Sequence, residues 1–251
     1  MLTAERRQYI LESLRREGKV LTQALSATLG VSEDVVRRDL RELDAAGLLL
    51  RVHGGALPRS PAETTYSTRQ RQAPQAKAAI AAAAAGLLRD GQVILMDAGT
   101  TALAVAQSLA ADLHATVITA SPPIVVALAA HPHVEAIGLG GRLRKESMVL
   151  LGAETVAAVG RVRADVYVLG IGSIHPEMGM STADYEHAQL KRAMIAAAAD
   201  VIALASAERL GTAAAHIVGS LGDLAYLVTE RAVPDETLAP YRAAGIGIVQ
   251  S

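Results

Sequence analysis

The segment Val31–Gly55, VSEDVVRRDLRELDAAGLLLRVHGG, has the pattern of a capped helix followed by a short basic hairpin. Ser32 is a suitable N-cap, because its hydroxyl can accept a hydrogen bond from a free N–H group of the first helical turn. Val36, Leu40 and Leu43 recur at helical spacing. This spacing predicts a helix with one apolar face that packs on a small core.

The other side of this helix is basic. Arg37 and Arg41 are four residues apart and share a face, with Arg38 beside them. Gly47 predicts the end of the helix, and a strand and a Gly54-Gly55 turn should follow. We predict that an arginine-rich helix and a basic hairpin contact duplex DNA through Ser32, Arg37, Arg38, Arg41, Arg51 and His53. The alternative is a small helical domain whose arginines are only solvated.

The residues before this segment support the DNA-binding interpretation. Glu5–Glu17 has helical periodicity, Thr22 can begin a second short helix, and Gly30–Ser32 forms a turn. Helix, short helix, turn, long helix and hairpin is the order of a winged helix-turn-helix domain.

The charge distribution points the same way. The formal net charge of the 251-residue chain is −1. Residues 1–72 contain 12 Lys and Arg against 9 Asp and Glu, a net of +3, and the remaining residues have a net of −4. The basic surplus therefore lies with the expected DNA-binding domain. Because it is modest, we expect two or more such domains to bind together, in a homo-oligomer that is a dimer or a tetramer.

Composition excludes several classes of protein. The chain has no Cys, so disulfides, thiolate nucleophiles and Cys-ligated zinc are excluded. Aromatic residues make up 2%, too few for a platform that stacks single-stranded bases. No segment has the pattern of a signal peptide or a membrane span, so we expect a cytoplasmic protein. We also expect no metal site and no cofactor.

The rest of the chain predicts a second, larger domain. Leu57–Pro74 is polar and proline-rich, which is typical of a linker. Beyond it, seven short apolar runs alternate with helical segments, which predicts a mainly parallel sheet with helices on both faces. We thus divide the chain into a winged helix-turn-helix domain (residues 1–57), a linker (58–74) and an α/β effector-binding and oligomerisation domain (75–251).

Glycine, hydroxyl and acidic residues follow several of these strands, where ligands bind in such sheets. Asp97–Thr101, DAGTT, follows a strand and opens a helix, so its free N–H groups and hydroxyls could hold a phosphate. An ordinary strand-to-helix turn is the alternative. Gly140, Gly141 and Arg142 form a second strand-end turn, which approaches a ligand or is simply a turn. Glu186 and Lys191 lie early in a helix and contact sugar hydroxyls or only solvent.

The sequence resembles the DeoR family of bacterial repressors. The resemblance rests on VS-x-x-x-x-RRDL from Val31, the R-x-HGG segment from Arg51, and MDAGTT, the strand-end GG-R and GIGSIHPEMGMSTADYEHAQLKRAMI in the second half. The family usually has Thr where this chain has Val35. Its sensor domain resembles sugar-phosphate isomerases in fold and typically binds a phosphorylated sugar or a related metabolite.

The resemblance implies a set of effector contacts in the second domain. With the residues noted above and Ser121, the predicted set is Lys77, Asp97, Gly99, Thr100, Thr101, Ser121, Gly140, Gly141, Arg142, Glu186, Lys191 and Arg209. The chain differs from the family pattern at Ala120, Ser206 and Arg209, where Asn, Asp and Lys are usual. These differences favour a ligand with more negative charge or fewer hydroxyls than a simple sugar monophosphate; the alternative is that the domain has drifted and now only oligomerises.

Two functions therefore compete. The first is a transcriptional regulator, expected to be a repressor, which binds a DNA operator and a small phosphorylated metabolite. The second is a sugar-phosphate isomerase with an added N-terminal domain, in which Asp97 and Glu186 would be the candidate acid and base. A complete helix-turn-helix with its wing has no use in an isomerase, so we expect no catalytic residues.

Overall fold

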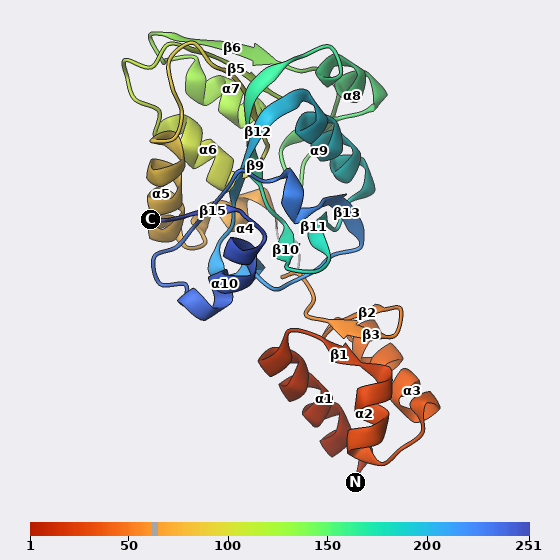
Figure 1. The fold of residues 1–251 in the computed structure, drawn as a ribbon. Coiled ribbons are helices and arrows are strands. Elements are labelled where there is room, and N and C mark those ends of the chain that lie inside the picture. The colour runs from red at the N-terminus through yellow and green to blue at the C-terminus, as the bar shows by residue number, and fades with distance from the viewer. Residues whose placement is uncertain (62–64) are drawn as a thin grey trace.

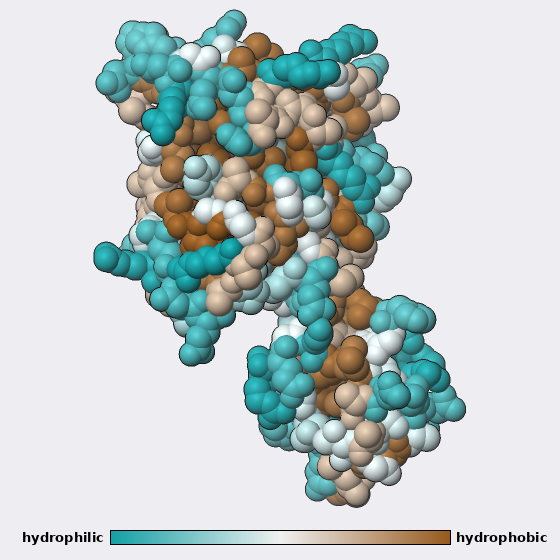
Figure 2. Space-filling view, viewed as in Figure 1, coloured by the Kyte–Doolittle hydropathy of each residue, from teal (hydrophilic) through white to brown (hydrophobic). Residues whose placement is uncertain are grey.

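The computed structural model describes residues 1–61 and 65–251, which form a small N-terminal lobe and a larger α/β lobe (Figure 1). Figure 2 shows that the two lobes meet across a narrow waist. The small lobe has the element order α1 (Thr3–Glu17), β1 (Val20–Leu21), α2 (Thr22–Leu29), α3 (Glu33–Ala45), β2 (Leu50–Val52) and β3 (Gly55–Leu57). This order confirms the predicted winged helix-turn-helix, with β2 and β3 as the wing.

The three helices and the wing enclose one small core. Val36, Leu40 and Leu43 of α3 are buried in it, as their spacing predicted. The helix ends in a Schellman motif, because the N–H groups of Gly47 and Leu48 donate to the carbonyls of Asp44 and Leu43 at 2.9 and 3.0 Å. Gly47 adopts the left-handed conformation that this motif requires (φ 73°).

Ser32 occupies the N-cap position of α3, but the prediction for its hydroxyl is wrong. The Ser32 side chain makes no capping hydrogen bond. Glu33 and Asp34 instead place negative charge at the start of the helix, where it offsets the dipole. The Ser32 hydroxyl is exposed and thus available to a partner.

A buried ion cluster connects α1 to α3. The Asp39 carboxylate is inaccessible to solvent and accepts from Arg6 Nε at 2.5 Å and from Arg7 Nε at 3.1 Å. Burial alone would raise the pKa of Asp39, but the hydrogen bonds from Arg6 and Arg7 outweigh it and hold the pKa below its usual range. This acid therefore supports the position of α3 rather than facing DNA.

The segment expected to be a linker contains a short helix, α4 (Tyr66–Arg71). The hydroxyl of Thr65 caps it by accepting from the Thr68 N–H at 3.2 Å. Residues 62–64 of this segment lie outside the described residues. The next helix, α5 (Pro74–Ala85), begins at a proline, which suits the first turn because its missing N–H has no partner there.

A seven-stranded parallel sheet forms the centre of the larger lobe. Its strand order is β15-β14-β12-β9-β4-β5-β6. The strands are β4 (Val93–Met96), β5 (Ala115–Thr119), β6 (Val134–Gly138), β9 (Ala164–Gly170), β12 (Ala198–Leu204), β14 (Tyr226–Thr229) and β15 (Gly247–Gln250). Each corresponds to one of the seven predicted runs.

Helices cover both faces of the sheet, as predicted. On one face, Ile94 and Met96 of β4 pack with α5, α6 (Thr100–Gln107) and α7 (Pro122–Leu128). On the other, Leu95 packs with α8 (Ala153–Val159), α9 (Tyr185–Ala197) and α10 (Asp235–Ala243). Because successive side chains of a strand point to opposite faces, a continuous apolar run serves both cores.

Smaller β elements flank the sheet. The strands β7 (Arg142–Arg144) and β8 (Val149–Leu151) form a hairpin, and β10 (Ser173–His175), β11 (Gly179–Thr182) and β13 (His216–Gly219) form a separate antiparallel sheet. The sequence had not indicated these elements or α8. In the described parts of the chain, no helix combines the length and the apolar character needed to cross a bilayer.

In the described parts of the chain, the two lobes meet at two places. At the first, the turn of the β10–β11 hairpin lies against the end of α1, where Lys19 Nζ and Glu177 Oε1 are 2.5 Å apart. At the second, the chain leaving the wing runs beside Ala213: its carbonyl accepts from the Ser60 N–H at 2.9 Å, and its N–H donates to the Pro58 carbonyl at 3.0 Å.

Candidate DNA-binding surface and effector cavity

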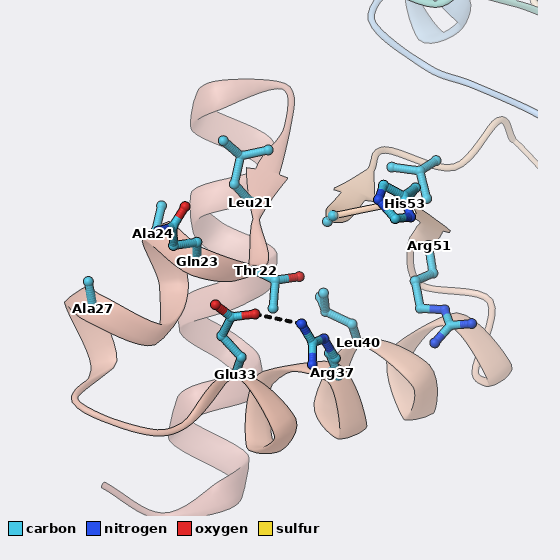
Figure 3. Close-up of a pocket in the computed structure, with 13 residues that line it drawn as sticks. Leu21, Thr22, Gln23, Ala24, Ala27, Glu33, Arg37, Leu40, Arg51 and His53 are labelled. Atoms are coloured by element: carbon cyan, nitrogen blue, oxygen red, sulfur yellow. Dashed lines mark hydrogen bonds and ion pairs between the residues drawn. The ribbon is translucent and has the colours of Figure 1, made fainter.

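A groove of about 1130 Å³ crosses the small lobe between α2, α3 and the wing (Figure 3). Arg37 contributes from α3, and Arg51 and His53 contribute from the wing. The wing lies against β1, and this close approach requires glycine at position 55, because a Cβ there would lie 1.9 Å from the Val20 carbonyl oxygen. The fold thus brings three of the six predicted DNA-binding residues to one concave surface.

The remaining candidates lie outside the lining of this groove. Arg38 and Arg41 are exposed on α3, and Ser32 is exposed at its start. Arg37 is already paired within its helix, with Nη2 at 2.6 Å from Glu33 and Nη1 at 3.2 Å from Asp34. A DNA phosphate or base must therefore compete with two exposed carboxylates for Arg37.

A second cavity, of about 490 Å³, lies in the larger lobe at the carboxyl ends of β4 and β9. The strand order runs from β4 to β6 in one direction and from β9 to β15 in the other, so this is the point where the topology reverses. Ligands bind at this point in open parallel sheets. Five predicted effector residues line the cavity: Lys77, Thr100, Thr101, Lys191 and Arg209.

The start of α6 forms one wall of this cavity. Gly99 is the N-cap, with a φ of 131° that a residue with a side chain would adopt only with strain. Helical bonding begins where the Leu103 N–H donates to the Gly99 carbonyl at 2.9 Å, which leaves the earlier N–H groups for other acceptors. With the hydroxyls of Thr100 and Thr101, these groups can hold an oxyanion.

Asp97 lies behind this wall in a buried charge network. Its carboxylate pairs with Lys191 and accepts from the Gly170 N–H at 3.0 Å, which ties the end of β4 to the end of β9. Lys191 also donates to the Gly170 carbonyl at 2.8 Å. Burial would raise the pKa of Asp97, but Lys191 and then His187 outweigh it and lower the pKa. Asp97 is thus ionised and holds Lys191 at the cavity.

His187 is a cavity residue that the sequence analysis missed. It is 7% exposed, and its Nε2 lies 3.5 Å from Asp97 Oδ1 without a hydrogen-bond partner among the described residues. Burial, and then the charge of Lys191, lower the pKa of His187, so its ring is neutral. His187 and Lys191 are four residues apart on α9, so helical spacing from Lys191 could have identified it.

Lys77 is less available than its place in the cavity suggests. Its ammonium donates to the carbonyls of Arg69 and of Gln72, the latter at 2.7 Å. Burial, and then the nearby Arg69, lower the pKa of Lys77. Lys77 therefore fixes the segment before α5 against the cavity and retains one donor for a ligand.

The other predicted effector residues lie elsewhere. Arg142 pairs with Glu186 on the surface, where both side chains are largely exposed. Gly140 accepts a hydrogen bond from the Thr155 hydroxyl at 2.6 Å, and Gly141 is next to it. Ser121 is buried at the start of α7, and Ala120 belongs to the hydrophobic core. None of these residues lines the cavity.

Both lobes match models of known domain families. Residues 6–61 match the DeoR-like helix-turn-helix domain, and residues 72–231 match the DeoR C-terminal sensor domain. Over about half of each chain, the fold also has a limited likeness to ribose 5-phosphate isomerase A from Methanocaldococcus jannaschii (16% identity, TM-score 0.39, 53% and 52% coverage). No function follows from this distant match.

Relatives that align with most of this chain are named as transcriptional regulators or repressors. The chain is 32% identical to the transcriptional regulator GlpR of Haloferax volcanii, over 99% of this chain and 98% of that protein. It is 33% identical to the repressor GlcR of Bacillus subtilis, over 92% and 90%. It is 29% identical to the glycerol-3-phosphate regulon repressor of Escherichia coli, over 93% of each. These relatives are regulators, which decides against the isomerase hypothesis. The chain belongs to the DeoR family of DNA-binding transcriptional regulators.

Proposed function

We propose that this protein is a repressor that binds operator DNA through α3 and the wing, and whose affinity for DNA changes when an anionic metabolite enters the sensor cavity. The cavity carries the second half of this proposal. It combines the start of α6, two threonine hydroxyls and the cations Lys77, Lys191 and Arg209 in one space. Such a donor set suits a phosphate group.

The cations indicate the charge of the ligand. Lys191 is balanced by buried Asp97, whereas Arg209 faces the exposed Glu208 at 3.4 Å, a pair that solvent weakens. The planar guanidinium of Arg209 can bind a second oxyanion with two N–H groups. We therefore expect a bisphosphate or a phosphorylated acid to bind more tightly than a sugar monophosphate.

Calorimetry tests the ligand class. The full chain is titrated with inorganic phosphate, glycerol 3-phosphate, a sugar bisphosphate and a phospho-acid, with glycerol as the uncharged control. We expect binding of the phosphorylated compounds only, and weaker binding after Thr100→Ala or Lys191→Ala. Tight binding of glycerol that neither variant affects would overturn the assignment of the cavity to phosphate.

We further propose that the protein acts as a homo-oligomer assembled through residues 75–251. One small lobe presents only a few arginines to DNA, so its contribution to phosphate neutralisation is limited. Two lobes on two half-sites would add their contacts, as in other helix-turn-helix proteins.

A further inference from the structure

Arg209 touches both the effector cavity and the chain that leaves the wing. It lines the cavity, yet its Nη1 donates to the Gly172 carbonyl at 3.1 Å and lies 3.5 Å from the Ser60 hydroxyl. The Ser60 hydroxyl in turn donates to the Gly172 carbonyl at 3.0 Å. Arg209, Ser60 and Gly172 thus form a closed set of contacts between the cavity wall and the chain between the lobes.

The same chain is connected to the DNA-binding helix. Arg59 donates from Nη2 to Asp44, in the last turn of α3, at 2.8 Å and from Nε to the Leu49 carbonyl at 3.0 Å. Its backbone pairs with Ala213 of the sensor lobe. Three consecutive steps, from Arg209 to Ser60, to Arg59 and to Asp44, therefore join the cavity to α3.

Each of the two forks that the guanidinium offers to a ligand oxyanion includes a nitrogen that already has a partner. Each fork that includes Nη2 also uses either Nη1, which serves Gly172 and Ser60, or Nε, which faces Glu208. An anion gives shorter and stronger hydrogen bonds than a neutral carbonyl or hydroxyl. A ligand that approaches through the Nη1 fork draws Arg209 away from the chain between the lobes.

We infer that Arg209 is the switch of this regulator: an anionic ligand takes its guanidinium from Gly172 and Ser60 and so frees the segment Pro58–Ser60 from the sensor lobe. The wing and the end of α3 then lose their fixed position against that lobe. This inference rests on the proposed anionic effector, and it specifies the residue through which that effector acts.

Hydrogen exchange of the full-length protein tests the switch. The probes are glycerol 3-phosphate and inorganic phosphate, with glycerol as the uncharged control, and the amides followed are Ser60 and Ala213, which bond across the contact between the lobes. We expect the phosphate probes to speed exchange at both amides about fivefold or more, the lower range of ordinary allosteric coupling.

Two variants and one control separate the outcomes. Ser60→Ala removes an acceptor of Arg209 that does not line the cavity, so it should bind the probes at least as well as the parent while exchange responds little to them. Arg209→Lys should weaken the response, because an ammonium lacks the planar fork. Arg163→Lys, at an exposed arginine whose side chain donates to the adjacent Val162 carbonyl, should respond as the parent does.

The results distinguish this inference from the proposed function. If calorimetry shows that the phosphate probes bind but hydrogen exchange at Ser60 and Ala213 does not change, the inference about Arg209 is wrong. The proposal of an anionic effector is then retained. The switch is also wrong if Ser60→Ala responds as fully as the parent. If no phosphate probe binds, the proposed effector fails and the switch fails with it.

Discussion

The Asp39 carboxylate in α3 lies fully buried under the Arg6 guanidinium of α1, with Oδ2 and Nε 2.5 Å apart. Asp39 directly follows two exposed arginines in the sequence, yet its side chain packs inside the DNA-binding lobe. Among the described residues of the small lobe, Arg6 and Asp39 are the buried charged side chains, and their contact joins α1 to α3.

Loss of Asp39 should destabilise the DNA-binding lobe. Asp39→Ala leaves the Arg6 guanidinium buried without a counter-charge, which typically costs about 3–5 kcal/mol in the free energy of unfolding. Glu42→Ala is the matched control, because it removes only the exposed partner of Arg7 and should cost about 0–1 kcal/mol. Chemical unfolding followed by circular dichroism measures both. An equal decrease in the free energy of unfolding in both variants would show that the buried pair stabilises the lobe no more than the exposed one does.

The same ion pair predicts that the stability of the DNA-binding lobe depends on pH. Because the pKa of Asp39 is lower in the folded lobe than its usual 3.8, its contribution to stability is present above pH 3.8 and is lost as the pH falls through the lowered value. Stability measured from pH 6 down to pH 2 should therefore decline more steeply in the parent than in Asp39→Asn. Parallel curves would contradict this assignment.

The arginines of α3 and the wing should differ from those of the sensor lobe in DNA binding. Arg38→Ala or Arg51→Ala should shallow the salt dependence by about one charge if the contact is a phosphate, or cost about 1–3 kcal/mol and relax one base position if it is a base. Fluorescence anisotropy at several salt concentrations distinguishes the two. Arg89→Ala, on the surface of the sensor lobe, is the control. Parental binding by Arg37→Ala, Arg38→Ala and Arg51→Ala would refute the groove assignment.

His187 should recognise hydroxyl groups of the ligand rather than its phosphate. Its neutral ring lines the cavity, and its buried Nε2, 3.5 Å from Asp97 Oδ1, has no hydrogen-bond partner among the described residues. We expect a ligand hydroxyl to use it, so His187→Ala should weaken binding of glycerol 3-phosphate by up to about tenfold, which corresponds to one neutral hydrogen bond. Calorimetry with inorganic phosphate is the internal control, since that probe has no hydroxyl arm. An equal loss for both probes would indicate a general change in the cavity.

Oligomerisation should persist without the DNA-binding lobe. We expect residues 73–251 alone to form a dimer or a tetramer in analytical ultracentrifugation, because the proposed interface lies in the α/β lobe. The isolated segment 1–72 should be monomeric under the same conditions. A monomeric 73–251 segment at high micromolar concentration would place the interface elsewhere.

Much of the fold could be predicted because its signals are local. The seven strands of the sheet are short apolar runs such as Val93–Met96, and Gly47, which ends α3, lies directly after the helix. The sheet of β10, β11 and β13 gave no such signal. Its strands are short, and β13 joins them from more than thirty residues further along the chain.

Only part of the candidate site could be predicted, because only some of its residues have a local sequence signal. Asp97 and Thr100 follow a recognisable strand, whereas the positions of Gly140 and Arg142 depend on strand order. Both follow β6, which is the edge strand two places from β4, so they are displaced by roughly 10 Å from the point where the topology reverses. Strand order depends on long-range pairing, such as Ile94 with Val166, and no local pattern encodes it.

That pairing has a consequence for synthesis on the ribosome. The contacts of the small core all lie within the first 57 residues, so this lobe can fold as soon as they have emerged. The central strand β4 must wait for β9, and the bond from Gly170 to Asp97 closes the cavity only after a further 73 residues have been made. A nascent chain can therefore carry a folded DNA-binding lobe before the cavity of the proposed effector has formed.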